Sequence, residues 1–307
     1  MSDRGQDRFA LGVAIDTVCA VNAERLAGLI GSPVAAVRPL DGGSICRAVQ
    51  VELADGRTAF AKTARGAVPA DFFSAEANGL RWLSDVPGGP PLPQVLGHDD
   101  ELLALNWVDE GAPTANAADR LGRELDALHA SGAEGYGAGW AGYIGSVPMD
   151  NTPERTWPEF YAGRRIAPYV RMLRDDGTLD STGAFDRLAD RLADLAGPPE
   201  PPARLHGDLW SGNVLWGTDE RAYLVDPAAY GGHRETDLAM LRLFGAPHLE
   251  RVVAAYAEGA AARGRPLADG VEDRVELHQL FPLLVHAVIF GGGYVARAVG
   301  VARRFAG

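Results

Sequence analysis

The chain has 307 residues, 47% of them hydrophobic and 23% charged, and its 41 acidic and 29 basic residues give a formal net charge of −12. These fractions are ordinary for a globular protein and exclude a wholly disordered chain. The acidic balance argues against a nucleic-acid partner, because binding a phosphate backbone needs clustered Lys and Arg.

The cysteine content and the apolar stretches of the sequence indicate in which cellular compartment to expect the protein. Two cysteines, Cys19 and Cys46, are too few for a disulfide framework and favour a reducing environment. Residues 1–8 alternate acid and base, unlike a secretion signal. The most apolar late stretch, 281–296, contains Pro282 and falls short of about 18–20 uninterrupted apolar residues. We therefore expect a cytoplasmic protein with no membrane partner.

The first third of the chain predicts a helix and then a small antiparallel sheet. Residues 16–30 place apolar side chains on one helical face and end at Gly31. Asp55-Gly56 is a strong hairpin signal, and a second helix is predicted over about 69–83. The predicted strands lie at 34–40, 45–53, 57–63, 94–97 and 101–108.

From about residue 114 the pattern becomes helical. The predicted helices lie at 117–130, 153–174, 184–195, 236–244, 248–263 and 271–303. A Pro-rich break at 198–202 and a hairpin of 214–216 against 222–225 interrupt them. The sequence thus predicts an α+β protein. Its parts are an N-terminal segment with a helix (1–33), a nucleotide-binding N-lobe (34–108), and a catalytic and substrate-binding C-lobe (109–307).

Three polar residues after the Pro-rich break carry the clearest chemistry. Asp208 is followed by Asn213 after five residues and by Asp226 after eighteen. Phosphoryl transfer needs a carboxylate beside the acceptor hydroxyl and oxygen ligands for Mg²⁺. Each residue alone is more often a turn or strand-end residue, but the joint spacing matches the catalytic loop and metal-binding Asp of protein kinases. We predict Asp208 as the catalytic base and Asn213 and Asp226 as Mg²⁺ ligands, in a two-lobed protein-kinase-like fold that uses ATP.

The N-lobe supplies candidate nucleotide contacts. Lys62 ends the third strand, and Glu76 lies fourteen residues later in the helix. A strand Lys held by a helix Glu places an ammonium on the α- and β-phosphates of a nucleotide. On their own these two residues would be interpreted as solvated surface charges. The predicted catalytic loop at 208–213 favours a nucleotide site instead. Phe60 shares the face of Lys62 and could line the adenine or the core.

Two further segments complete the predicted nucleotide site. The glycine pair in Gly42-Gly43-Ser44 can expose backbone amides to phosphates, although most such pairs are simple turns. The connector Asn106-Trp107-Val108 lies where a kinase hinge offers backbone groups to adenine. His206, two residues before Asp208, is predicted to brace the catalytic loop.

Residues 34–305 resemble the fructosamine kinase (ketosamine-3-kinase) family, a branch of the kinase-like fold that includes aminoglycoside phosphotransferases and choline kinases. The resemblance rests on the segments 143–151, 157–165, 206–213, 226–240 and 277–294. Trp210, two residues after Asp208, is characteristic of this family, whereas aminoglycoside and choline kinases usually lack an aromatic residue there.

The resemblance implies an activity and three residue roles. It implies phosphorylation of a ketosamine hydroxyl, the 3-hydroxyl of fructosamine or ribulosamine adducts, in deglycation, with glycated protein open as a substrate. An acidic protein would suit such a cationic substrate. Trp210 would be a flat wall for the sugar or a loop-packing residue, and Asp237 would brace the catalytic loop. Some relatives carry a redox-sensitive Cys directly after the glycine pair, where this chain has Ser44. Cys46 lies two residues further on, in the predicted strand, so we expect it to be an ordinary strand residue.

Three alternatives remain at this stage. An aminoglycoside- or choline-type small-molecule kinase would share the catalytic residues. A metal-dependent hydrolase would use His206, Asp208, Asp226 and His233 without ATP. A pseudokinase scaffold would bind nucleotide without consuming it. The oligomeric state is open.

Overall fold

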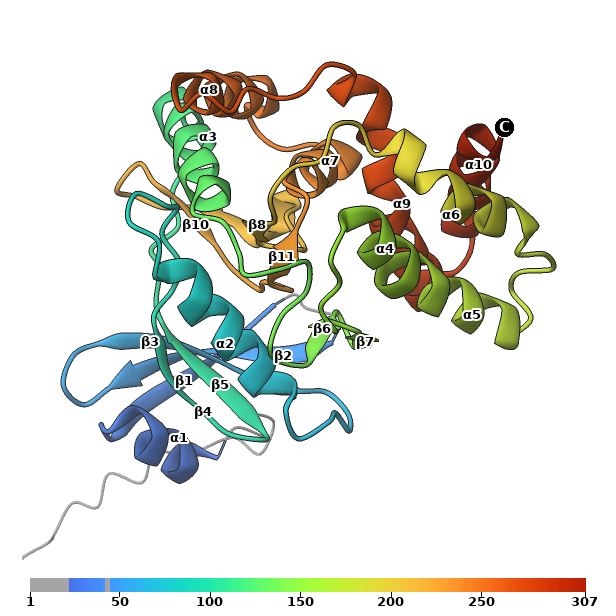
Figure 1. Cartoon of the computed structure of the whole chain (residues 1–307). Coiled ribbons are helices and arrows are strands. Elements are labelled where there is room, and N and C mark those ends of the chain that lie inside the picture. The colour runs from blue at the N-terminus through green and yellow to red at the C-terminus, as the bar shows by residue number, and fades with distance from the viewer. Residues whose placement is uncertain (1–21, 42–44) are drawn as a thin grey trace, which may run out of the picture.

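Alternating apolar residues in the first third of the chain form a five-stranded antiparallel sheet. The structure, a computed structural model, describes residues 22–41 and 45–307. The strands are β1 (Val34–Leu40), β2 (Cys46–Leu53), β3 (Thr58–Ala64), β4 (Val95–His98) and β5 (Leu102–Asn106). Their order is β1-β2-β3-β5-β4, which places β3 in the centre (Figure 1). Lys62 on β3 therefore lies between Ala48 and Leu103 of the neighbouring strands.

Two helices cover the two faces of this sheet. Helix α1 (Ala23–Ile30) packs through Leu26 on one face, with Val51 and Ala61. Helix α2 (Phe72–Ser84) packs through Phe73 on the other face, with Leu103. The sequence predicted a helix over 16–30. The structure begins α1 at Ala23, where Asn22 accepts hydrogen bonds from the first helical N–H groups, and residues 16–21 lie outside the described residues.

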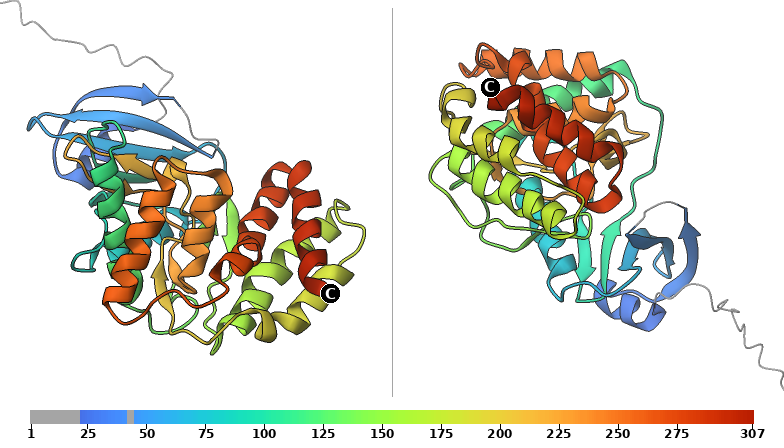
Figure 2. Two further views of the ribbon diagram at one scale, coloured as in Figure 1. Left: turned by 90° about the horizontal axis from the view of Figure 1, so that it is seen from above. Right: turned by 90° about the vertical axis from the view of Figure 1, so that its right-hand side faces the viewer.

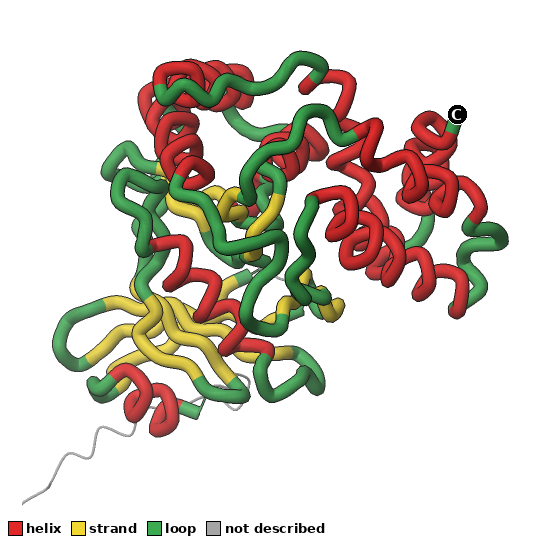
Figure 3. The backbone as a smooth tube through the Cα atoms, viewed as in Figure 1, coloured by secondary structure: helices red, strands yellow, loops and turns green. Residues whose placement is uncertain are grey.

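The rest of the chain is mainly helical and forms the second lobe (Figures 2 and 3). Its helices are α3 (Ala115–Ala130), α4 (Trp157–Phe160), α5 (Ala167–Asp175), α6 (Gly183–Leu195), α7 (Glu235–Phe244), α8 (Leu249–Ala262), α9 (Val271–Phe290) and α10 (Gly293–Ala306). The π-helical segment η1 (Tyr161–Ile166) joins α4 to α5, and a single 3-10 turn forms η2 (Ser211–Asn213). The two-lobed fold predicted from the sequence is confirmed.

Short strand pairs lie among the helices of the C-lobe. The predicted hairpin is present as β9 (Val214–Trp216) against β10 (Ala222–Leu224). Two pairs were not predicted: β6 (Gly142–Ile144) with β7 (Val147–Met149), and β8 (Ala203–Leu205) with β11 (Tyr230–Gly232). Strands of three residues are too short for a sequence periodicity to reveal them. Among the described helices, none is both long and apolar enough to cross a lipid bilayer.

One predicted helix, 271–303, is wrong as a single element. The chain leaves the helical conformation at Gly291 and Gly292, where φ is +63° and +59°. Side chains other than glycine rarely adopt these angles, so the glycine pair ends α9 and lets the chain reverse. Helix α10 then packs back against α9 and α6.

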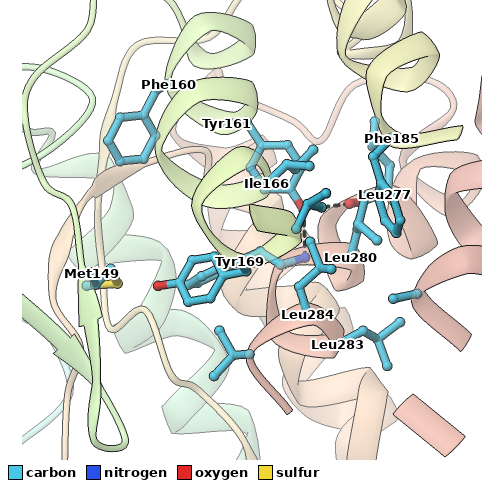
Figure 4. Close-up of a cluster of buried hydrophobic side chains, with 14 of the residues drawn as sticks. Met149, Phe160, Tyr161, Ile166, Tyr169, Phe185, Leu277, Leu280, Leu283 and Leu284 are labelled. Atoms are coloured by element: carbon cyan, nitrogen blue, oxygen red, sulfur yellow. Dashed lines mark hydrogen bonds between the residues drawn. The ribbon is translucent and has the colours of Figure 1, made fainter. Parts of the chain in front are cut away.

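Pro282 interrupts the hydrogen bonds of α9, and Tyr161 compensates. Proline has no N–H to donate, so the carbonyl of a residue one turn earlier loses its partner. That carbonyl belongs to His278 and lies 3.3 Å from the Tyr161 hydroxyl. The same hydroxyl donates to the Leu277 carbonyl at 2.6 Å and accepts from the Phe281 N–H at 3.1 Å (Figure 4). The buried core of the C-lobe therefore contains an inserted hydroxyl that fixes η1 against α9.

A second buried polar cluster lies beside this core. Both oxygens of Glu235 accept from Arg274, at 2.9 and 2.6 Å, and His278 stacks on Trp157 with ring centroids 4.6 Å apart. Burial, with a smaller effect from neighbouring His278, lowers the pKa of His233 to about 3. Burial lowers the pKa of His278 as well, so both histidines are neutral in the folded protein at ordinary pH.

Helices α3 and α8 touch through a glycine. A Cβ on Gly122 would lie 2.3 Å from the Val252 carbonyl oxygen and 2.8 Å from the Ala255 Cβ. Gly122→Ala should therefore destabilise the protein by about 1–3 kcal/mol, because two helix backbones must separate. Gly300→Ala is the control: it lies inside α10 with no atom within 4 Å, and should stabilise by up to ~1 kcal/mol. Urea unfolding measures both; equal effects would contradict the packing argument.

The buried histidines predict sensitivity to acid. An unfolded histidine takes up a proton near pH 6.5, whereas His233 in the folded protein resists protonation down to about pH 3. The stabilisation is present above pH 6.5 and should fall by about 1.4 kcal/mol per pH unit below it for each such histidine. His233→Asn, whose side-chain oxygen can replace Nδ1 as acceptor of the Glu235 N–H, should flatten the decline in urea-unfolding free energy between pH 7 and 5. Parallel curves for the two proteins would show that His233 is not responsible.

Candidate active site

A cavity of about 530 Å³ is lined by residues of the sheet and of the helical lobe. Every predicted site residue within the described part of the chain lines it. These residues are Lys62, Glu76, Asn106, Trp107, Val108, Asp208, Trp210, Asn213 and Asp226. The predicted glycine-loop residues Gly42, Gly43 and Ser44 lie outside the described residues. The fold therefore brings together groups that are up to 164 positions apart in the chain.

Lys62 is the centre of the charge arrangement in this cavity. Its Nζ lies 2.7 Å from Glu76 Oε2 on α2 and 2.8 Å from Asp226 Oδ1, which follows β10. The Lys62 side chain is only 8% exposed, whereas that of Asp226 is 51% exposed. Burial alone would lower the pKa of Lys62, but the charges of Asp226 and Glu76 outweigh it and raise that pKa. The ammonium is therefore permanently charged and fixed in place.

The two carboxylates beside Lys62 differ in environment. Burial raises the pKa of Glu76 to about 7, and its second oxygen, Oε1, is buried without a hydrogen-bond partner. The Lys62 charge lowers the pKa of Asp226 in spite of partial burial. Asp226 is therefore ionised, half open to the cavity, and available to a cation.

The backbone at Asp226 is in an uncommon conformation. Its φ is +53°, which is rare for residues other than glycine and costs about 1–3 kcal/mol. The neighbouring Val225 N–H donates to the Asn213 carbonyl at 3.1 Å, which ties this turn to the catalytic loop. The turn directs the Asp226 carboxylate to Lys62.

Asp208 and Asn213 face each other in the same loop. Asn213 Nδ2 donates to the Asp208 carbonyl at 2.9 Å and to Asp208 Oδ2 at 3.1 Å. Since the Asn213 amide nitrogen is used, its oxygen is the atom it can offer to a cation. Burial raises the pKa of Asp208 to about 7, although the Asn213 hydrogen bond opposes this. A carboxylate with such a pKa is well matched to accept a proton near neutral pH.

Asp237 and His206 hold this loop from behind. Asp237, at the start of α7, accepts from the N–H groups of His206 and Gly207 at 2.8 and 3.0 Å. The His206 Nε2 lies 2.9 Å from the Val225 carbonyl, so it carries the hydrogen, and Nδ1 accepts from the Asp208 N–H at 3.3 Å. Both residues therefore occupy the bracing positions that were predicted for them.

These contacts argue against the hydrolase alternative. Both ring nitrogens of His206 are engaged, so neither is free to bind a metal ion. His233, Glu235 and His278 do bring ligand-type atoms within 4.8 Å of one another. However, Arg274 already occupies both Glu235 oxygens, and we interpret this cluster as structural.

Sequence reasoning missed the contact that joins the lobes at the cavity rim. The Tyr143 hydroxyl on β6 donates to Asp71 Oδ1 at 2.5 Å, and its ring lies 5.2 Å from that of Phe72. Tyr143 belongs to one of the segments that carry the family resemblance, but nothing in its spacing indicates a partner 72 positions away.

A family model described as fructosamine kinase matches residues 22–305. The chain belongs to the fructosamine kinase family. Membership makes it a kinase and a phosphotransferase, as the sequence predicted.

Three known proteins are similar to this chain, one in sequence and fold, one in sequence, and the third in fold alone. A crystal structure from Thermobifida fusca, assigned as a fructosamine-3-kinase, is 51% identical with a TM-score of 0.85, covering 92% of this chain and 97% of that one. The chloroplastic protein-ribulosamine 3-kinase of Arabidopsis thaliana is 32% identical over 258 residues, 80% of this chain and 76% of its own. An aminoglycoside phosphotransferase solved with ADP and hygromycin B shares the fold: TM-score 0.57, 18% identity, and coverage of 92% of this chain and 97% of that one.

The hydrogen bonds that Asp237 accepts from the His206 and Gly207 N–H groups predict the effect of Asp237→Asn. An amide in this place turns one acceptor into a donor and leaves a buried N–H of the catalytic loop without a partner. We expect a loss of about 1–3 kcal/mol in unfolding free energy, together with a lower kcat, because the Asp208 backbone shifts. The matched control is Asp180→Asn, an exposed carboxylate on the chain surface. Thermal unfolding and steady-state kinetics test this; stability like that of the control would show that Asp237 is not a brace.

Proposed function

We propose that this protein transfers the γ-phosphoryl group of ATP to a sugar hydroxyl of a ketosamine, the 3-hydroxyl of fructosamine or ribulosamine adducts. One observation carries the proposal. In a member of the fructosamine kinase family, a buried Lys62 held by Glu76 and Asp226 shares one cavity with the Asp208–Asn213 pair. The one cavity thus offers a cation for phosphates and a base for a hydroxyl.

The nucleotide would enter from the sheet side. Lys62 Nζ would bind the α- and β-phosphates, and Glu76 would keep it oriented. The connector Asn106–Val108 and Phe60 line the cavity where adenine would lie. The neighbour solved with ADP supports a nucleotide in this fold. Positioning of this kind supplies much of the rate enhancement in phosphoryl transfer.

The donor set beside Lys62 fits Mg²⁺. Asp226 provides a half-exposed carboxylate and Asn213 an uncommitted amide oxygen, both of which are ligand types that Mg²⁺ prefers. When bound, the ion would neutralise charge on the nucleotide phosphates. Because Asp226 is ionised and half exposed, it would be able to hold the ion.

Asp208 would orient the acceptor hydroxyl and take its proton. Its pKa of about 7 makes it a stronger base than an ordinary carboxylate, and Asn213 holds its Oδ2 in place. General-base assistance of this kind usually contributes about 10²–10⁴-fold. His206 and Asp237 keep the carboxylate at a fixed position without touching substrate.

The acceptor is inferred from the relatives. The plant homologue is named a protein-ribulosamine 3-kinase, and the Thermobifida protein is assigned as a fructosamine-3-kinase. Trp210 lines the cavity beside Asp208 and offers a flat apolar surface to a sugar. We propose a small ketosamine, free or protein-bound, as substrate, phosphorylated as a step in deglycation in the cytoplasm.

An ATP-consumption screen tests the function. Fructosyl-lysine, ribulosyl-lysine and erythrulosyl-lysine should each be compared with choline and kanamycin. We expect turnover of at least one ketosamine and of neither control amine. Asp208→Asn should lower kcat by at least about 10²-fold with little change in nucleotide affinity, because the base is lost and the Lys62 site is kept. Asp180→Asn should behave like the native protein.

Two results would contradict the proposal. Turnover of choline or kanamycin alone would replace the ketosamine with another small-molecule acceptor. Full activity in Asp208→Asn would show that Asp208 is not the base. Binding of nucleotide without consumption in the presence of every acceptor would favour the pseudokinase alternative.

A further inference from the structure

An exposed strip of aromatic side chains begins at the catalytic loop. Its members, which we call the aromatic strip, are Trp210, Phe244, His286, Phe290 and Tyr294. Within the described residues, the large hydrophobic side chains that stay exposed are Trp210 at 38%, Phe244 at 36% and Phe290 at 58%. All three belong to this strip although they come from the loop before η2 and the ends of α7 and α9.

Ring contacts connect the strip without a gap. Trp210 meets Phe244 edge-on with centroids 6.0 Å apart, and Phe244 lies 4.9 Å from the His286 ring. His286 in turn lies 5.6 Å from Phe290 and 5.0 Å from Tyr294. Apolar surface gathered in one place next to a cleft is typical of a binding surface rather than of scattered exposure.

The strip is continuous with the cavity. Trp210 lines the cavity itself. A Cβ on Gly145, another lining residue, would lie 3.0 Å from Ile289 and 3.1 Å from Ile45. The end of α9, where Phe290 follows Ile289, therefore lies at the cavity rim, and a molecule whose hydroxyl reaches Asp208 can extend over the strip.

Gly212 fixes the position of Trp210. A Cβ at Gly212 would lie 2.2 Å from the indole ring, so the ring packs directly against the loop backbone at Gly212. Because residue 212 has no side chain, the indole can occupy this place, where it lines the cavity and contacts Phe244. The strip is therefore preorganised at its inner end.

His286 gives the strip a neutral, polar atom. Its Nδ1 lies 2.8 Å from the Pro282 carbonyl, which can only accept, so Nδ1 carries the hydrogen and Nε2 has a free lone pair. Burial lowers the pKa of His286, and the charge of Arg297 adds to this. A neutral ring does not repel a cation.

We propose that the aromatic strip is an amine-side subsite, which binds the protonated secondary amine of the ketosamine and the apolar chain attached to it. The inference rests on the proposed function. Aromatic faces attract ammonium groups, and apolar chains stack on them. The net charge of −12 favours a cationic ligand over an anionic one. The strip would thus select the amine half of the substrate, while Asp208 acts on the sugar half.

Substrates that share a sugar and differ in the amine test this. The pair is fructosyl-methylamine and fructosyl-benzylamine, measured at saturating ATP and Mg²⁺. We expect kcat/KM to favour the benzyl compound by about 10-fold, through KM, because both substrates carry the ammonium and only the benzyl compound adds a ring contact, which is worth up to about that factor. Phe290→Ala should lower this preference about five-fold.

Matched variants separate the contributions. Phe290→Tyr keeps the ring and should keep the preference. Phe290→Leu keeps apolar surface but loses the π-face, and should fall between the native protein and the alanine variant. Thermal unfolding should be the same in all three, since Phe290 is 58% exposed.

The outcomes are distinguishable. No turnover of any ketosamine overturns the proposed function and this inference with it. Turnover of both adducts with equal kcat/KM, or a preference that Phe290→Ala leaves unchanged, overturns the inference alone. If sedimentation shows that Phe290→Ala turns a dimer into a monomer while the preference stays the same, the strip is an interface between copies and the proposal is wrong.

Discussion

The buried ammonium of Lys62 is the interaction on which the site depends. A cation withdrawn from water is stable only with close counter-charges, and here one comes from α2 and the other from the turn after β10. The second belongs to the C-lobe, so the same contact that stabilises Lys62 also joins the lobes. Any ligand that draws Asp226 away must supply a replacement negative charge to Lys62, which the phosphates of the proposed nucleotide would do.

A second set of contacts makes the catalytic loop rigid. Asp237, His206 and Asn213 together occupy backbone and side-chain groups of the loop, so the Asp208 N–H and one Asp208 carboxylate oxygen both have partners. The positive φ of Asp226 is a local strain that these contacts and the Lys62 pair compensate. The site is thus assembled from buried polar groups that nearly all have partners, which is the condition for a polar network to specify one geometry.

Much of the fold was predictable because its signals are local. Each signal lies within a few residues or one hairpin. They are the alternation of apolar and polar residues in β2, the Asp55-Gly56 turn, and the spacing of Asp208, Asn213 and Asp226. The helix predicted over 271–303 failed because apolar periodicity continues through Gly291, and only the positive φ there ends it. The pairs β6–β7 and β8–β11 escaped because their strands are three residues long.

The sequence by itself determined the residue types of the site, their spacing along the loop and the family to which the chain belongs. Only the tertiary structure decided which carboxylates meet Lys62, that Tyr143 joins Asp71 across the lobes, and that Trp210 continues into Phe244 and Phe290. The spacing of residues along the sequence indicates which residues are neighbours within one helix, strand or loop. These contacts instead join different elements, and the packing of the whole chain brings them together. The strip and the lobe contact therefore became visible only in three dimensions.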